Sequence, residues 1–584
     1  MKTNNIINWR ALLKVSGIAA MAALTMNVSA DTYTFPSASS GSANWDSNSA
    51  GGWVLEGTGT IGTLPPGGAD VDVVIGSGTN ALVFEYVIGG TGVGTTNVVR
   101  NSLTISDSVT LQILYHGHRI AYSTVTNQSL MEVLGTRTIA KDTGGGSPLL
   151  FINSGTILHH TTGAQLTING TINNTGGLID LGGGARFSLA YNNNNAGIYG
   201  GTLTLASSGT FDTGSVLTGT VTFSDVAINN AGVMVAVNNV TNNDYRRLYF
   251  TATNGIFNNT GTVSVWQGVN HDISSINNSV HTDVFTQSGT NVFTNTGVIS
   301  VLNESVTNSS AYYETGVAFN VSNNAAAGGK FTNDGLIDIR DNAHGTYSST
   351  TYARFTVNNG ADFTNSGTIN IALGNDVTDD ALHTAALFIN TDWANTGVIT
   401  VDRANKEHAT ASLELNGQTY TQTGADSETR LLNDGQLKAS AVIINDGLLG
   451  GAGLIDAATT LNTGATLDPD GTLTLASLTM NNGSILNFSA TDLLQINGDL
   501  NFNGATLTLT DYTGGDPLLL ANYTGDLLGK NLTISGLDNA VLNFDTIGKI
   551  YLVVIPEPTT TFLLTLGALI LILMRKPRRK NTER

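Results

Sequence analysis

The sequence predicts an all-β protein built as a parallel β-helix solenoid, and three observations support this fold class. The 584-residue chain contains 68 Gly, only 9 Pro and no Cys, with 12% charged residues and abundant Asn and Thr. Such a composition is typical of turn-rich β-structure. A short motif recurs through residues 131–545, and alternating apolar and polar residues follow each copy. One copy buries too little surface to be stable alone, so the copies are expected to stack.

Each repeat consists of an apolar anchor, an Asn-x-Gly corner and an alternating strand. Glycine tolerates a sharp corner, and the Ile and Val residues of the strand point inward at every second position. Asn repeated at one corner would form a hydrogen-bonded ladder along the stack. A β-sandwich array is the alternative, disfavoured by the frequent turn signals and the absence of a linker. The copies begin at Phe151, Phe257, Phe293, Phe331, Phe363, Trp393 and Leu431, and corner glycines from Gly261 to Gly435 lie 30 to 38 residues apart.

The N-terminal flank consists of a secretory signal peptide over residues 1–30 and a β-rich cap over 31–130. Three basic residues precede the apolar run 15–26, and small residues end at Ala30, so cleavage before Asp31 is expected. Stacked coils need a terminal cap, which we assign to the following short strands. Asp70 and Asp72 alternate with valines there and are interpreted as a solvated strand face, since calcium requires more oxygen ligands.

The end of the repeat body is rich in glycine. It contains Gly450-Gly451-Ala452-Gly453 and Asp468-Pro469-Asp470-Gly471. Residues 445–510 resemble the autotransporter-associated β-strand repeats of β-helical surface proteins. The Pro-Asp-Gly sequence is interpreted as a turn, because the distant Glu of a calcium loop is missing.

The C-terminal segment, residues 546–584, carries three features in a fixed order. A final strand and Pro556-Glu557-Pro558 precede the apolar stretch 559–574, which is expected to form a hydrophobic helix. Its 16 residues fall short of the about 20 that span a bilayer. The segment resembles the PEP-CTERM sorting signal of Gram-negative bacteria, which implies processing by an exosortase after transient residence in the inner membrane. An ordinary membrane anchor is the alternative. The basic residues expected to stop transfer are Arg575, Lys576, Arg578, Arg579 and Lys580.

Charge limits the classes of partner. The whole chain has a formal charge of −19, and removing residues 1–30 and 559–584 lowers it to −27, because those segments hold nine positive charges and one negative charge. So acidic a body disfavours nucleic acid, whose binding requires Lys and Arg. With no Cys, neither a disulfide nor a thiolate metal site can form.

No constellation of residues predicts catalysis, a metal site or a cofactor. The acidic residues of 376–392 include paired carboxylates like those of glycosidases, but no third group is positioned beside them. His116 and His118 would share one strand face without a third ligand, and His159 and His160 would face opposite sides. The acidic candidates are Asp376, Asp379, Asp380 and Asp392.

The sequence therefore predicts an exported, non-enzymatic structural or adhesive protein of the cell surface or extracellular matrix. Exopolysaccharide or a neighbouring cell surface is the expected partner. The alternative is a polysaccharide-degrading β-helix lyase or glycoside hydrolase that uses the same aspartates.

Overall fold

The structure is a computed structural model in which the chain forms two compact units. One comprises residues 1–191 and 195–210, and the other residues 192–194 and 211–584. The structure describes residues 31–35, 43–44, 54–55, 68–75, 84–85, 99–105, 110–113, 119–133, 137–140, 149–160, 164–182, 185–189, 196–199, 202–205, 210–212, 219–238, 248–267, 280–307, 314–345, 350–374, 382–404, 408–512, 516–537, 539–555 and 560–574.

The first unit consists of parallel ladders. One ladder runs from β1 through β4, β6, β8 and β11 to β13, and a second runs from β7 through β9, β12 and β14 to β17. Only β3 pairs antiparallel to β1 among the described strands of this unit. Pairing continues across residue 130, where the boundary between cap and body stays a prediction. The strands are β1 (Asp31–Phe35), β2 (Ala43–Asn44), β3 (Val54–Leu55), β4 (Gly68–Ile75), β5 (Phe84–Glu85), β6 (Val99–Ile105), β7 (Thr110–Ile113), β8 (Arg119–Asn127), β9 (Leu130–Val133), β10 (Arg137–Ala140), β11 (Leu149–Asn153), β12 (Thr156–His159), β13 (Gln165–Asn173), β14 (Leu178–Leu181), β15 (Arg186–Leu189), β16 (Ala196–Tyr199) and β17 (Thr202–Leu205).

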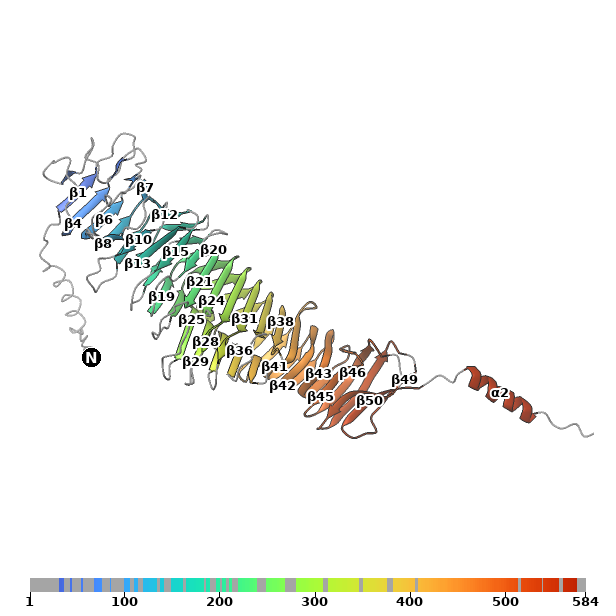
Figure 1. The fold of residues 1–584 in the computed structure, drawn as a ribbon. Helices are drawn as coiled ribbons and strands as arrows, with labels where there is room; N and C mark the ends of the chain where they lie inside the picture. Colours follow the sequence, from blue (N-terminus) through green and yellow to red (C-terminus); the bar gives the residue numbers. More distant parts are fainter. Residues whose placement is uncertain are drawn as a thin grey trace, which may run out of the picture. The chain divides into compact units, whose positions relative to one another are not determined.

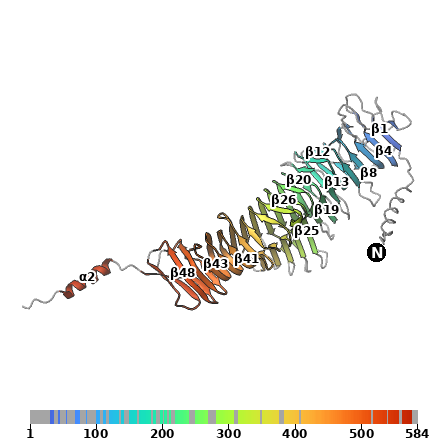
Figure 2. The ribbon, with the colours of Figure 1, turned by 180° about the vertical axis from the view of Figure 1, so that it is seen from behind.

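The second unit repeats a coil of three strands, and each strand pairs in parallel with its counterpart in the next coil. The three ladders are β22-β25-β29-β33-β36-β39, β23-β26-β30-β34-β37-β40 and β24-β27-β31-β35-β38-β41. Figure 1 and, from behind, Figure 2 show these strands stacked in succession.

The elements of this unit follow in chain order. They are β18 (Thr210–Asp212), β19 (Gly219–Ser224), β20 (Ala227–Asn230), β21 (Val233–Asn238), β22 (Leu248–Thr253), β23 (Ile256–Asn259), β24 (Thr262–Gln267), β25 (Val280–Gly289), β26 (Val292–Asn295), β27 (Val298–Asn303), β28 (Val306–Thr307), β29 (Glu314–Asn323), the 3₁₀ turn η1 (Ala325–Ala327), β30 (Lys330–Asn333), β31 (Leu336–Asp341), β32 (His344–Gly345), β33 (Thr350–Val357), β34 (Phe363–Asn365), β35 (Thr368–Leu373), β36 (Leu382–Ile389), β37 (Trp393–Asn395), β38 (Val398–Asp402), β39 (Ala409–Glu414), β40 (Thr419–Gln422), β41 (Glu428–Ile444), β42 (Gly447–Leu461), β43 (Ala465–Met480), β44 (Ile485–Phe488), β45 (Leu493–Ile496), β46 (Leu500–Leu509), β47 (Leu518–Tyr523), β48 (Leu527–Ser535), β49 (Ala540–Asn543), β50 (Lys549–Val554) and α2 (Thr560–Met574).

The glycine-rich end of the repeat body keeps the same parallel pairing, but its strands continue through the corners of the coil. Strands β41, β42 and β43 are 15 to 17 residues long and pair along most of their length, with a shift in register at each corner. The last coil ends differently, because β50 pairs antiparallel to both β47 and β49. The edge of β47 that is not paired with β45 is therefore occupied by β50.

The core of the second unit contains two interleaved files of aromatic rings. Phe257, Phe293 and Phe331 stack at centroid distances of 4.3 and 4.7 Å. Phe285, Phe319 and Phe355 form the facing file, in which successive rings lie 4.6 and 4.9 Å apart. Rings of the two files meet edge to face, an arrangement that adds about 0.5–1.5 kcal/mol per pair to the burial of area.

The predicted parallel β-helix is confirmed, and it replaces the alternative of a β-sandwich array. The predicted anchors from Phe151 to Trp393 are buried. The assignment of Leu431 as the next anchor is wrong, because Tyr420 aligns with Trp393 whereas Leu431 aligns with Val401. The sequence Asn433-Asp434-Gly435 resembles the corner of the repeat, but it lies at a different corner of the coil, where Asn433 and Asp434 take positive φ values.

Candidate functional site

Most residues predicted for sorting and for signal cleavage lie outside the part of the chain that the structure describes. The Pro-Glu-Pro motif Pro556, Glu557 and Pro558, the basic residues from Arg575 to Lys580, and Ala30 belong to this group. Asp31, the expected first residue of the mature chain, begins β1. The predicted roles of these residues therefore stay predictions.

The predicted C-terminal helix is present as α2. It is 15 residues long and contains no charged residue, and its side chains from Leu569 to Met574 are exposed. Among the helices that the structure describes, none combines the length and the hydrophobicity needed to cross a membrane.

The acidic candidates for glycosidase chemistry are not brought together by any described contact. Asp376, Asp379 and Asp380 lie outside the described residues. Asp392 is exposed, and its Oδ1 accepts a hydrogen bond of 2.8 Å from the backbone N–H of Thr419 in the next coil. This contact gives Asp392 a role in holding one turn against another.

The histidine candidates have structural partners where they are described. His159 is buried, with Nδ1 2.9 Å from the carbonyl oxygen of Val133 and Nε2 3.2 Å from that of Ala164. His160 faces the other side, with Nε2 3.3 Å from a carboxylate oxygen of Asp180. The prediction that the two histidines face opposite sides is confirmed, whereas His116 and His118 lie outside the described residues.

The remaining acidic candidates lie on strands or turns. Asp468 accepts a hydrogen bond of 3.2 Å from Nη2 of Arg430. Asp470 is exposed within β43, so the turn predicted at Pro469-Asp470-Gly471 is instead a corner inside this strand, where Gly471 has a φ of +107°. Asp70 and Asp72 are part of β4, but their side chains are not described. Within the described ranges, no three His, Asp or Glu side chains are grouped as metal ligands.

A ladder of buried asparagines runs along the corner that follows the aromatic anchors. In the second unit each Nδ2 donates to the Oδ1 of the asparagine in the next coil, at 2.6 to 2.8 Å. Asn127, Asn153 and Asn174 form a shorter ladder in the first unit, at 2.7 and 2.6 Å. The predicted ladder is confirmed. Its members in the second unit are Asn230, Asn259, Asn295, Asn333, Asn365 and Asn395.

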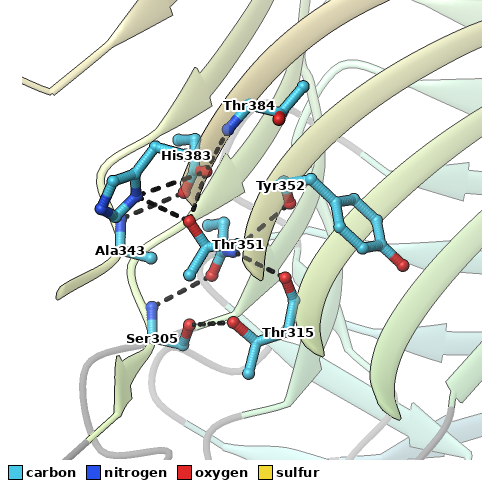
Figure 3. A network of polar contacts seen from close by, with 9 residues as sticks. Ser305, Thr315, Ala343, Thr351, Tyr352, His383 and Thr384 are labelled. Carbon is cyan, nitrogen blue, oxygen red and sulfur yellow. Dashed lines mark hydrogen bonds and ion pairs between the residues drawn. The ribbon is translucent and has the colours of Figure 1, made fainter. Parts of the chain in front are cut away.

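A second buried polar cluster lies at another corner of the same coils and includes Asp341, Thr351 and His383 (Figure 3). The hydroxyl of Thr351 lies 2.6 Å from Oδ2 of Asp341 and 2.6 Å from Nδ1 of His383. The backbone N–H groups of Ala343 and Thr384 also donate to Asp341, at 3.2 and 3.1 Å. The carboxylate therefore accepts three hydrogen bonds although it is sealed from water.

The neighbouring coil carries a neutral version of this cluster. Asn303 aligns with Asp341, and Thr315 aligns with Thr351. The backbone N–H of Ser305 donates to Oδ1 of Asn303, while the hydroxyls of Ser305 and Thr315 lie 2.9 Å apart. This cluster was not predicted from the sequence. The alternation of each strand could have revealed it. Asn303 and Asp341 lie two residues after the inward residues Val301 and Ile339, so their polar side chains also face inward.

The Asp, His and Thr side chains of this cluster are not arranged for nucleophilic catalysis. In a catalytic triad the hydroxyl donates to the histidine, and the carboxylate holds the other side of the ring. Here the Thr351 hydroxyl donates to Asp341, so Nδ1 of His383 must be the donor to Thr351. Asp341 and Thr351 have no solvent exposure and His383 only 3%, which leaves a substrate no access.

The comparisons with known proteins give a structural similarity but no family. No protein-family model matches the chain, and no curated protein matches it. A solved structure to which the chain is similar is the crystal structure of the autotransporter UpaB from E. coli strain CFT073. The alignment has 14% sequence identity and a TM-score of 0.29, and covers 83% of this chain and 96% of that one.

Proposed function

We propose that this protein is an exported, non-enzymatic component of the cell surface or extracellular matrix that contacts polysaccharide through the outer faces of its coils. Support comes from the different residue types at the inward and outward positions of the strands. Inward positions hold apolar residues and the asparagine ladder, and some outward positions carry small polar residues that align in successive coils, at the strand spacing of about 4.8 Å. A polymer lying along such a file would meet similar polar side chains in successive coils.

The observation that carries this proposal is a file of threonines on the ladder of short strands. Thr294, Thr332 and Thr364 align in successive coils, and each is outward because its two neighbours are a buried Phe and a buried Asn. Their hydroxyls can donate and accept, which matches the hydroxyl groups of a sugar chain. The hydroxyls of Thr332 and Thr364 lie 3.4 Å apart, so the file is continuous there.

The sorting tail supplies the route to the surface in this proposal. The resemblance of residues 546–584 to PEP-CTERM signals supports recognition by an exosortase. The apolar residues of α2 would reside in the inner membrane only transiently, since the helix is shorter than a full span. The basic residues after it would stay on the cytoplasmic side until processing.

The test is light scattering of the producer's exopolysaccharide before and after addition of the exported protein. Binding predicts co-elution of protein with polymer, or a rise in polymer molar mass. Replacing Thr294, Thr332 and Thr364 by Ala should weaken that binding. The matched control replaces Thr251, Thr286 and Thr356, which are also outward but lie on another ladder, and should bind as the native chain does.

The same measurement detects the alternative function. A fall in polymer molar mass would show cleavage of glycosidic bonds and contradict the non-enzymatic proposal. The cleavage should then disappear when Asp376, Asp379, Asp380 and Asp392 are replaced by Ala. No change in the polymer at all would contradict the polysaccharide partner and leave a neighbouring cell surface as the partner to test.

A further inference from the structure

We propose that Trp266 and Glu304 form a binding site for an uncharged pyranose ring of a polysaccharide, in which the indole supplies a flat apolar surface and the carboxylate accepts hydrogen bonds from sugar hydroxyls. The two residues belong to successive coils: Trp266 lies on β24, and Glu304 follows directly after β27 in the same ladder. This inference rests on the proposed contact with polysaccharide and names the kind of sugar that one site would bind.

Trp266 points away from the core of the coil. Its neighbours Val265 and Gln267 are fully buried, so the alternation of β24 turns the indole outward. The indole is half-buried, and so is Leu302, the residue aligned with it in the next coil. The two side chains therefore lie next to each other on the outer face, where part of their apolar surface is open to solvent.

A hydrogen bond fixes the orientation of the indole. Nε1 of Trp266 donates to Oε2 of Glu304 at 2.9 Å. The backbone of Glu304 is held against the same coil, because its N–H donates to the carbonyl oxygen of Gln267 at 2.8 Å. The ring is thus oriented before any ligand arrives, which lowers the entropy that binding must overcome.

The fold of the coils does not require this pair of side chains. The positions aligned with Trp266 in the two following coils hold Leu302 and Arg340. The backbone hydrogen bond made by Glu304 is made in the next coil by Asn342. The contact between an indole and a carboxylate is therefore particular to one level of the stack, as expected of a site rather than of a repeated element.

The chemistry of these groups indicates the class of ligand. One face of a pyranose ring presents C–H groups, which can cover the indole, and the edge of the ring carries hydroxyls, which can donate to a carboxylate. Glu304 uses one of its several lone pairs for Trp266, so others remain for a sugar. Ser264 and Ser300 lie on the same outer face, two residues before Trp266 and Leu302, and add hydroxyls that donate or accept.

Charge disfavours an acidic sugar at this site. A uronate would bring its carboxylate close to that of Glu304, and like charges repel each other. Arg340, aligned with Leu302 in the next coil, is already paired with Asp338 at 2.9 Å. The chain as a whole is also strongly negative. The site should therefore select an uncharged pyranose over a uronate.

The test is isothermal titration calorimetry of the exported protein with two uncharged polymers, galactomannan and hydroxyethyl cellulose, and with polygalacturonate. At least one uncharged polymer should bind, and polygalacturonate should bind at least about fivefold more weakly. Binding should also reduce the quenching of Trp266 emission by acrylamide, measured as the difference between the native chain and W266F. Binding to neither uncharged polymer, or preference for polygalacturonate, would overturn the inference.

Three variants test the two residues. W266A should weaken binding of the uncharged polymer by about tenfold, because an aromatic contact is lost, and W266F should weaken it less. F388A removes another half-buried outward ring, on β36 of a different ladder, and should bind as the native chain does. E304Q keeps an oxygen for the indole N–H but loses the charge, so it should reduce the discrimination against polygalacturonate. Native behaviour of W266A or of E304Q would overturn the inference.

The failure of this site and the failure of the proposed function give different results. If W266A co-elutes with the producer's exopolysaccharide as fully as the native chain does, the site is wrong while the proposed contact with polysaccharide stands. If neither chain co-elutes, the proposed function is wrong, and the titrations with the defined polymers decide on the site. W266F keeps the test decisive if W266A does not fold, since its emission and its affinity should both change.

Discussion

At the residue scale, the amides of the asparagine ladder replace the water that buried polar groups would otherwise need. Each rung uses Nδ2 as the donor to the next coil and Oδ1 as the acceptor from the previous one. A buried polar group that loses its partner costs about 1–3 kcal/mol. A defect in one rung therefore affects two neighbours, in the coils on either side.

Replacing Asn333 by Leu should destabilise the second unit by about 2–4 kcal/mol, because the side chains of Asn295 and Asn365 each lose a buried partner. Equilibrium unfolding in urea measures the change. Asn370 to Leu is the matched control, since Asn370 lies on an outward position of the next coil and should change stability by no more than about 0.5 kcal/mol. Equal losses in the two variants would contradict the role of the ladder.

Tyr420 gives a prediction about alkaline pH. Burial raises the pKa of its phenol, although hydrogen bonds with Thr429 and Asn395 lower it in part. The folded state therefore keeps the proton while the unfolded chain releases it above about pH 10, so stability is full below that pH and falls as the pH rises. Tyr420 to Phe should show a weaker loss between pH 9 and 11 in thermal unfolding. Tyr512 to Phe, a half-buried tyrosine near the last coils, should follow the native curve.

At the element scale, the corner glycines show why strands from adjacent coils can come so close. A Cβ added at Gly335 would collide with the carbonyl oxygen of Gly297, which accepts the N–H of Leu336 at 2.8 Å. The same contact joins Gly297 to Gly261 and Gly367 to Gly335. Close approach of the backbone, rather than a positive φ, is what requires glycine at this corner.

Gly335 to Ala should accordingly cost about 2–3 kcal/mol, because neither backbone can move away without breaking the ladder. Gly360 to Ala is the matched comparison: its φ is +80° but nothing lies near the added Cβ, so only backbone strain of about 1–2 kcal/mol remains. Urea unfolding of both variants ranks the two effects. A larger loss at Gly360 would show that strain, not crowding, governs the corners.

The elements also show how far the sequence predicts the fold. The periodic anchors and corners predict parallel stacking and the asparagine ladder, because these depend on residues close together in one repeat. The alignment of Tyr420 with Trp393 was missed, since its Thr-Tyr-Thr-Gln sequence lacks the Asn-x-Gly corner. The Asp341 and His383 cluster was missed because its members lie 42 residues apart and meet only when coils stack.

At the scale of the whole molecule, we expect substitutions in the sorting tail to change where the protein is found in the cell without changing its fold. Replacing Pro556, Glu557 and Pro558 by Ala should leave the protein in the cell envelope, because processing would stop while α2 remains attached. Fractionation and immunoblotting of the producing cells measure its release. Lys549 to Ala, an exposed change shortly before the motif, is the control and should be released normally. Normal release of the triple variant would contradict processing by an exosortase.

Because successive coils align residue by residue, a whole coil can be removed from the gene or added to it without disturbing the inward positions. Val298 aligns with Leu336 and Ile299 with Ile337, so removing residues 299–336 would join Val298 to Ile337 with every inward position preserved. The amide of Asn295 would then face Asn365 as it now faces Asn333. Unequal recombination between tandem repeats could therefore remove or add a coil in a single event. Related genes are expected to differ in length by whole coils, each changing the reach of the protein by about 4.8 Å.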